Sequence, residues 1–186
     1  MPVQTVHRFS TKDYHRMAET GLLKPSGRVE LLEGQIIDMS PIGPFHGSVT
    51  KRLNLLFTEL SHGRWVVAVQ DPVHLNEHSE PQPDLMLLKP APDFYRNSHP
   101  RPQHVFLLIE VADTSLDYDR GQKIPAYAQA GISEVWLLNL IDQTLEIFRD
   151  PGPAGYESTI LLHAKDQANP AAFPDVVVEL SALFTH

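Results

Sequence analysis

Two acidic residues stand inside stretches of sequence that otherwise have the composition of buried strands. Asp84 lies in PQPDLMLLK, residues 81–89, and Glu110 lies in VFLLIEVADTS, residues 105–115. Taking an ionised carboxylate out of water costs several kcal/mol unless a cation or a metal ion compensates the charge. Two such groups on neighbouring strands therefore predict a divalent-ion site, and Lys123, on the next element, could lie close to both.

The spacing within the second stretch indicates where Glu110 points. Side chains alternate between the two faces of a strand, so Leu108, Glu110 and Ala112 share one face. Ile109 and Val111 then share the other. A simpler alternative is that both acids cap loops or pair with a surface arginine. Acids that are partly buried without a partner are rare, which favours the metal site.

Glu30 and His46 are two further candidates. Glu30 lies in RVELLEGQIIDMSP, where Glu33-Gly34 is typical of a hairpin turn, and a solvated carboxylate on a strand face explains it equally well. His46 stands at the start of a predicted helix, where free N–H groups and the helix dipole favour an anion. The alternative is a histidine that only forms a hydrogen bond at that helix start.

A zinc-protease pattern also occurs. His74, Glu77 and His78 spell H-x-x-E-H, but this chemistry requires a helix that brings both histidines and the glutamate onto one face. Pro72 and Pro81 flank the segment, and the residues before it alternate as in a strand. The sequence therefore predicts a polar turn here and not a zinc protease.

A proline-rich loop is predicted at PAPDFYRNSHPRPQH, residues 90–104. Its basic and aromatic side chains are Phe94, Tyr95, Arg96, His99 and Arg101. On a loop they could grip a nucleic-acid backbone and stack on bases. A contact between two copies of the protein is the alternative, and the sequence leaves both open.

Hydrophobic spacing predicts the elements of the first half of the chain. A short helix capped by Ser10 or Thr11 should end at Gly21, and the hairpin around Glu33-Gly34 should follow it. The next helix carries an apolar stripe that indicates a core position: Val49, Leu53, Leu56, Phe57 and Leu60. RWVVAVQ then predicts a strand, which precedes the two strands that carry the acids.

The second half is predicted to begin with a helix from about Asp119 to Gly131, where glycine suits a left-handed cap. Pro125 is costly deep inside a helix, so the regular part should begin near Lys123. A hairpin turning near Asp142-Gln143 follows. An edge strand and a short C-terminal helical turn complete the expected α/β sheet.

Composition restricts the class of protein. The 186 residues, 42% of them hydrophobic, predict one globular domain spanning residues 1–186. The chain contains no cysteine, the N-terminus lacks the apolar core of a signal peptide, and a cytoplasmic location fits both observations. The net charge of −8 argues against a broadly basic nucleic-acid-binding surface, although a few cations gathered in one groove would suffice.

The chain resembles the Uma-type restriction endonucleases of the PD-(D/E)XK nuclease superfamily. The resemblance rests on Pro83-Asp84, on Ile109 to Val111 and on a lysine in the following helix. It extends over most of the chain through four stretches: VELLEGQIIDMSPIGPFH, PQPDLMLL, IEVADTSLDYDRGQK and YAQAGISEVWLLN. One departure is Ala112, which stands where the superfamily pattern has lysine; Uma-type sequences carry that lysine in the next helix, here Lys123.

The resemblance implies a restriction-endonuclease-like core: a mixed β-sheet flanked by helices, preceded by an N-terminal helix and hairpin. It also implies a Mg²⁺-dependent endonuclease acting on DNA, with Mn²⁺ as a substitute ion. Asp84, Glu110 and the Val111 carbonyl would bind the ion. Lys123 would position or activate water with a pKa lowered by desolvation, and His46 would face the phosphate or the metal. Glu30 has precedent in this family near the metal.

The expected partners are DNA and a second copy of the chain. The cations expected to contact DNA are Arg96, Arg101, Lys51 and Arg52. A symmetric homodimer is expected because two single-site domains most simply cut the two strands of a duplex. The alternative function is a catalytically silent module that binds nucleic acid or protein on the same fold, which Ala112 and the acidic composition favour.

Overall fold

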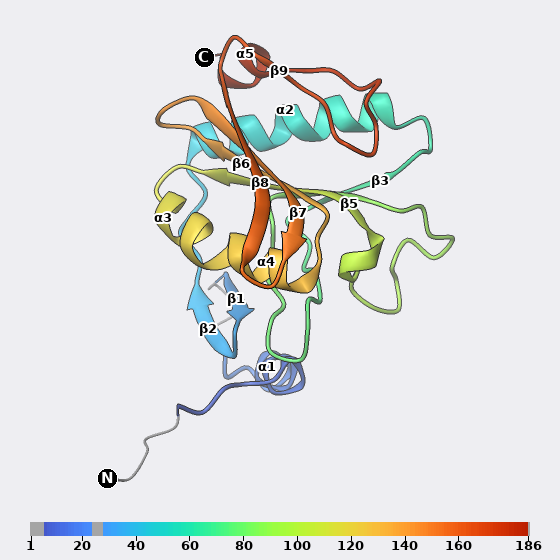
Figure 1. Ribbon diagram of the computed structural model, residues 1–186. Helices are drawn as coiled ribbons and strands as arrows, with labels where there is room; N and C mark the ends of the chain where they lie inside the picture. Colours follow the sequence, from blue (N-terminus) through green and yellow to red (C-terminus); the bar gives the residue numbers. More distant parts are fainter. Residues whose placement is uncertain (1–5, 24–27, 186) are drawn as a thin grey trace.

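A six-stranded mixed sheet forms the centre of the computed structural model, which describes residues 6–23 and 28–185 (Figure 1). The strand order is β3-β4-β5-β6-β7-β8. Neighbouring strands are antiparallel except β5 and β6, which are parallel and pair Leu108 with Val135. The strands are β3 (Val66–Val69), β4 (Leu85–Leu88), β5 (Val105–Ala112), β6 (Glu134–Asn139), β7 (Thr144–Gly152) and β8 (Gly155–His163).

Helices cover both faces of this sheet. In Figure 1, α2 and α5 lie over one face, whereas α3 and α4 lie under the other, beside a separate hairpin of β1 and β2. The helices are α1 (Thr11–Glu19), α2 (Pro44–Ser61), α3 (Leu116–Tyr118), α4 (Ile124–Ala130) and α5 (Leu180–Phe184). The remaining elements are β1 (Val29–Leu32), β2 (Gln35–Asp38), β9 (Gln167–Ala168), β10 (Val178–Glu179), the 3-10 turn η1 (Pro102–His104) and the π-helical turn η2 (Asp119–Lys123).

The predicted fold class is confirmed: a mixed sheet is flanked by helices and preceded by a helix and a hairpin. The apolar stripe of α2 buries Val49, Leu53 and Phe57 against the sheet. The ring of Phe57 contacts Trp65 and Trp136, with centroids 6.5 and 6.3 Å apart. This packing fixes the helix that carries His46 at its first turn.

Alternation along β5 divides the core into two layers, as predicted. Ile109 and Val111 pack in the layer that contains α2 and α5. Leu108 and Ala112 pack in the other, beside the helix that includes Tyr127. Glu110 therefore points toward α4 and the β1–β2 hairpin, so an ionisable group faces an apolar layer.

Local turn chemistry explains the N-terminal elements. Ser10 caps α1 through a reciprocal capping box with Asp13. The hairpin turns at Glu33 and Gly34, whose φ angles of +49° and +75° suit a two-residue turn. Helix α1 ends at Glu19, before the predicted Gly21, and Leu22 is exposed.

The helix that carries Lys123 begins earlier than predicted. It starts at Leu116 as α3, passes through the π-helical turn η2 and continues as α4. Pro125 explains the irregularity, because it has no N–H to donate to the preceding turn; the N–H of Ile124 instead bonds to the carbonyl of Asp119. Gly131 ends the helix in the predicted left-handed conformation, with φ of +81°.

The C-terminal half follows the predicted order. β6 and β7 form the hairpin, with Gln143 at positive φ in its turn, and β8 is an edge strand of the sheet. The short β9–β10 pair before α5 was not predicted. Among the helices of the described residues, none is both long enough and apolar enough to cross a membrane.

Candidate active site

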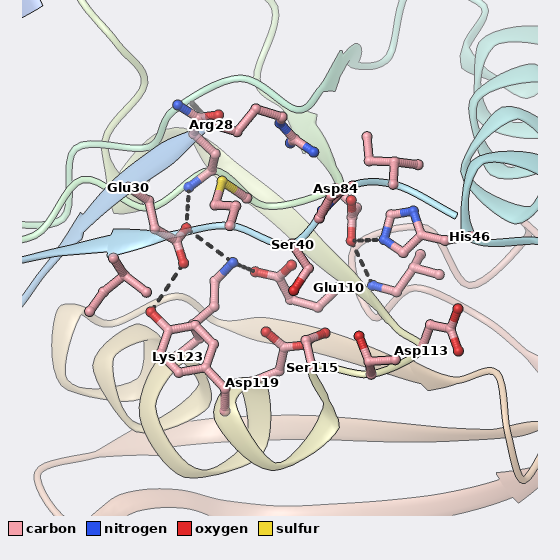
Figure 2. A pocket seen from close by; sticks show the side chains of 18 of the residues that line it. Arg28, Glu30, Ser40, His46, Asp84, Glu110, Asp113, Ser115, Asp119 and Lys123 are labelled. Carbon is pink, nitrogen blue, oxygen red and sulfur yellow. Dashed lines mark hydrogen bonds and ion pairs between the residues drawn. The ribbon is translucent and has the colours of Figure 1, made fainter. Parts of the chain in front are cut away.

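A cavity of about 360 Å³ opens where the β1–β2 hairpin, the end of β5 and the helix after it meet (Figure 2). Its lining brings together five residues that the sequence singled out: Glu30, His46, Asp84, Glu110 and Lys123. The polar residues that line it are Arg28, Glu30, Asp38, Ser40, His46, Gln82, Asp84, Glu110, Asp113, Thr114, Ser115, Tyr118, Asp119 and Lys123.

Asp84 is held by groups from three segments. Its Oδ2 accepts a hydrogen bond from the Val111 N–H at 2.9 Å and lies 3.1 Å from Nε2 of His46, while its Oδ1 accepts from Gln70 at 3.3 Å. The sequence had suggested that Asp84 lies inside a strand, but it directly precedes β4. The carboxylate, and not a backbone carbonyl, takes the Val111 N–H, which ends the β4–β5 ladder at this point.

His46 lies in the first turn of α2, as predicted, and faces Asp84. Its Nδ1 is buried and has no hydrogen-bond partner among the described residues. Burial alone lowers the pKa of His46, but the hydrogen bond and the charge of Asp84 raise it above its usual value. The same contact holds the pKa of Asp84 below its usual value, although burial acts in the opposite direction.

Lys123 sits between two carboxylates. Its Nζ contacts both Glu110 and Glu30 (Figure 2), at 2.7 Å from Oε1 of Glu110 and 3.3 Å from Oε2 of Glu30. All three side chains are at most 3% exposed. The hydroxyl of Tyr127 donates to Glu110 at 2.5 Å, and that of Tyr118 donates to Glu30 at 3.1 Å. The lysine from the helix after β5 therefore reaches the strand acid, as the sequence suggested.

Burial and charge shift the pKa values of this group. The pKa of Glu110 is raised to about 8, mainly by burial and also by the nearby carboxylates, while the charge of Lys123 acts in the opposite direction. Burial alone would lower the pKa of Lys123, but its paired carboxylates raise it above its usual value. The pKa of Lys123 among these acids is thus raised, because the ammonium is buried together with two of them, and the lowering expected for Lys123 beside a metal ion stays a prediction.

Several residues of the cavity were missed by sequence reasoning. Asp119 is buried, accepts a hydrogen bond from Ser115 at 2.6 Å and precedes Lys123 by four residues, a helical spacing that could have suggested it. Burial also raises its pKa. Arg28 lines the cavity, and the N–H of Gln82 donates to Glu30 at 3.0 Å. Arg28 and Gln82 each stand two residues before a site acid, Glu30 and Asp84, and this alternate spacing could have suggested both.

The four cations expected to contact DNA lie outside this cavity lining. Lys51 is exposed on α2. Arg52, on the same helix, donates to the carbonyl of Ala182 at 2.9 Å and to Thr185 at 2.6 Å, which ties α2 to the C-terminal segment. Arg96 and Arg101 line a second cavity. Their contact with DNA remains a prediction.

The H-x-x-E-H segment is a turn and not a helix, as predicted. His74 lies 3.1 Å from a carboxylate oxygen of Glu80, and His78 contacts the carbonyl of Phe9 at 2.9 Å. Within residues 6–23 and 28–185, one group of three side chains brings potential metal-binding atoms within 4.8 Å of one another: His15, Glu80 and His99. This group is distinct from the Asp84 and Glu110 pair.

Comparison with known proteins agrees with the resemblance seen in the sequence. The model of a family described as "Uma2: Putative restriction endonuclease" matches residues 11–182. Among curated proteins, none matches the chain. The crystal structure of a "putative nuclease belonging to DUF820" from Anabaena variabilis is similar, with 14% identity and a TM-score of 0.72 over 95% of this chain and 97% of that one. At this identity the likeness is one of fold.

Lys123→Met should destabilise the protein, because it leaves Glu30 and Glu110 buried without their shared cation. We expect chemical denaturation to show a loss of about 3–5 kcal/mol of unfolding free energy. In the native protein Glu110 loses its proton near pH 8. Without Lys123, Glu110 keeps its proton to higher pH. Because a buried Glu110 with a raised pKa lowers stability until it ionises, the unfolding free energy of the variant continues to fall above pH 8. In the native protein this decrease caused by Glu110 stops near pH 8.

The loss should therefore be larger at pH 9.5 than at pH 7, a range in which Lys123 of the native protein stays charged because its pKa is raised. Lys51→Met, which removes an exposed lysine from α2, is the matched control and should change stability by less than about 0.5 kcal/mol. Equal losses for the two variants would contradict the structural role of the buried lysine.

Proposed function

Because the chain belongs to the Uma2 family, described as putative restriction endonucleases, we propose that it is a Mg²⁺-dependent endonuclease that hydrolyses phosphodiester bonds in DNA. The observation that carries this proposal is the single cavity that joins Asp84, Glu110 and Lys123. Perturbed pKa values and burial of ionisable groups in one cavity are typical of catalytic sites.

The donor set of the cavity suits a hard cation. Carboxylates of Glu30, Asp84, Glu110 and Asp119 line it together, and oxygen atoms are the ligands that Mg²⁺ prefers. Mg²⁺ usually binds through one or two carboxylates and keeps several waters, so Asp84 and Glu110 would suffice. The N–H of Val111 donates to Asp84. Because the N–H and C=O of one strand residue point to the same edge, the Val111 carbonyl is a further candidate ligand.

Each residue of the cavity then has a role that follows from its contacts. When bound, the divalent ion would polarise the scissile phosphate and lower the pKa of a water molecule. His46 and the Val111 N–H orient the carboxylate of Asp84, as hydrogen bonds to metal-binding carboxylates generally do. Lys123 remains protonated and has three N–H donors, of which two face Glu30 and Glu110. The third can donate to a phosphate oxygen and stabilise developing negative charge.

Asp84→Asn and Glu110→Gln should each lower Mg²⁺-dependent cleavage of supercoiled plasmid DNA by at least about 100-fold, because each removes a charged ligand. Both amides keep the shape of the native side chain, so the fold should persist in circular dichroism. Glu59→Gln, an exposed position on α2, is the matched control and should cleave at the native rate.

The alternative function, a catalytically silent binding module, predicts a different result. The native protein would then bind DNA without nicking it at any Mg²⁺ or Mn²⁺ concentration, and the two variants would be indistinguishable from it. If the native protein and Asp84→Asn cleave DNA at the same rate, this cavity is excluded as the catalytic site.

DNA binding should be modest and should weaken steeply with salt, because an acidic chain with net charge −8 must rely on a few clustered cations. In an Asp84→Asn background, Arg96→Ala and Arg101→Ala should each reduce the slope of log affinity against log salt by about 1. Fluorescence anisotropy with a labelled duplex measures this slope. Arg64→Ala, whose guanidinium pairs with Asp175, is the control and should leave the slope unchanged. Affinity that does not change with salt would contradict the proposal.

The proposal includes a symmetric homodimer, since each copy of the chain contributes one such cavity and a duplex has two strands to cut. Light scattering coupled to size exclusion should give about twice the chain mass of 20.9 kDa at micromolar concentration. A monomer under these conditions, with or without duplex DNA, would remove the dimer from the proposal.

A further inference from the structure

A second cavity, of about 410 Å³, lies where three separate segments converge. Helix α1 contributes His15, the turn after β3 contributes His74 and Glu80, and the proline-rich loop contributes His99. The segments are joined by backbone hydrogen bonds: the N–H of Thr11 donates to the carbonyl of Glu77 at 2.7 Å, and that of His74 donates to Pro100 at 2.9 Å.

Glu80 is the buried centre of this cluster. Its side chain is 2% exposed, and its partners are histidines: Nε2 of His15 lies 2.5 Å from Oε1, and Nδ1 of His74 lies 3.1 Å from Oε2. No lysine or arginine of the described residues forms an ion pair with Glu80. A buried carboxylate whose partners are imidazoles can be stabilised further by a bound cation.

The cluster has the composition of a metal site. One ligand atom each from His15, Glu80 and His99 lies within 4.8 Å of the other two. Two imidazoles and a carboxylate are a ligand set that binds zinc, with ligand atoms about 2.0–2.2 Å from the ion and a fourth position left open. The rings of His15 and His99 are exposed, so small side-chain rotations can bring their nitrogens closer to the buried carboxylate.

We infer that His15, Glu80 and His99 form a second metal site, which binds a divalent transition-metal ion of the Zn²⁺ class. Imidazole nitrogen favours such ions, whereas the four carboxylates that line the cavity around Asp84 favour Mg²⁺, so the two sites differ in the ion they select. His74, through its contact with Glu80, orients the carboxylate and leaves the other side of the cluster to the ion.

The bound ion would join α1 to the proline-rich loop. His15 lies in the middle of α1, and His99 follows the stretch that holds Phe94, Tyr95 and Arg96. Arg96 and Arg101 line the same cavity, so a metal-bound His99 restrains the segment that carries these two cations. The site is unrelated to H-x-x-E-H chemistry, since it uses neither Glu77 nor His78.

The test is a titration of the protein with Zn²⁺, monitored by isothermal titration calorimetry. The whole chain is used without a histidine tag, and Mg²⁺ is present in excess. We expect one equivalent to bind, and His99→Ala and His15→Ala each to weaken the affinity at least tenfold. His163→Ala, an exposed histidine at the end of β8, is the matched control and should bind as the native protein does. Asp84→Asn should also bind normally, which separates this site from the proposed catalytic one.

His99→Ala is the deciding variant, because its side chain is exposed on a loop and its loss leaves the fold intact. Absence of stoichiometric Zn²⁺ binding by the native protein would overturn the inference; in that case the histidines only satisfy Glu80 by hydrogen bonding. Binding that persists at native affinity in either His99→Ala or His15→Ala would overturn it as well, and loss of binding in Asp84→Asn alone would assign the ion to the other cavity.

Limited proteolysis gives a second readout. Zn²⁺ should slow tryptic cleavage after Arg96 in the native protein, because the ion restrains the loop, and should leave the rate unchanged in His99→Ala. Equal protection of both proteins would show that Zn²⁺ acts on the protease or elsewhere on the chain, and would contradict a role for His99.

Discussion

The buried ammonium of Lys123 is the interaction on which the rest of the site depends. It pairs with Glu30 of β1 and Glu110 of β5, so one cation joins the hairpin, the central sheet and the helix after β5. Two carboxylates that are at most 3% exposed would otherwise be buried without compensation. Tyr127, Tyr118 and the N–H of Gln82 donate further hydrogen bonds to these carboxylates. The same contacts that stabilise the fold therefore hold the reactive groups in place.

The backbone irregularity at η2 explains how Lys123 reaches this position. Pro125 has no N–H to donate to the preceding turn, and the backbone forms a π-helical turn that ends at Lys123. Such turns recur at functional sites in proteins, where they redirect a side chain. Lys123 therefore reaches Glu110 from the helix after β5, while Ala112 packs in the apolar layer beneath α4. The alanine at position 112 and the helix irregularity before Pro125 thus occur together: the lysine comes from the helix and not from the strand.

A short extended segment links the two polar cavities. Glu80 faces the histidine cluster, Gln82 bonds to Glu30, and Asp84 enters the cavity that contains Glu110. These alternate residues share one stretch of backbone, which the bridge between Leu31 and Glu80 fastens to the hairpin. A change in the position of this segment would move side chains in both cavities. The β1–β2 hairpin, which lies outside the six-stranded sheet, is thus a structural part of the site.

The sequence by itself determined most of the elements and three of the central residues. Alternation along β5, the stripe of α2, the capping box at Ser10 and the turns at Gly34 and Gly131 are local features, and short-range spacing determines each of them. Asp84, Glu110 and Lys123 stood out because charged residues in apolar stretches require a partner, and because a family resemblance connected them.

Only the tertiary structure decided which charges meet. Lys123 lies 93 positions after Glu30, and Glu80 lies 65 positions after His15, so no local period relates these pairs. The raised pKa of Lys123 follows from the two acids that packing buries beside it. Arg28 and Gln82 likewise reach the cavity through the placement of the hairpin. The energy of a buried charge depends on its neighbours in space, and their positions are set by how the elements pack and not by the order of residues along the chain.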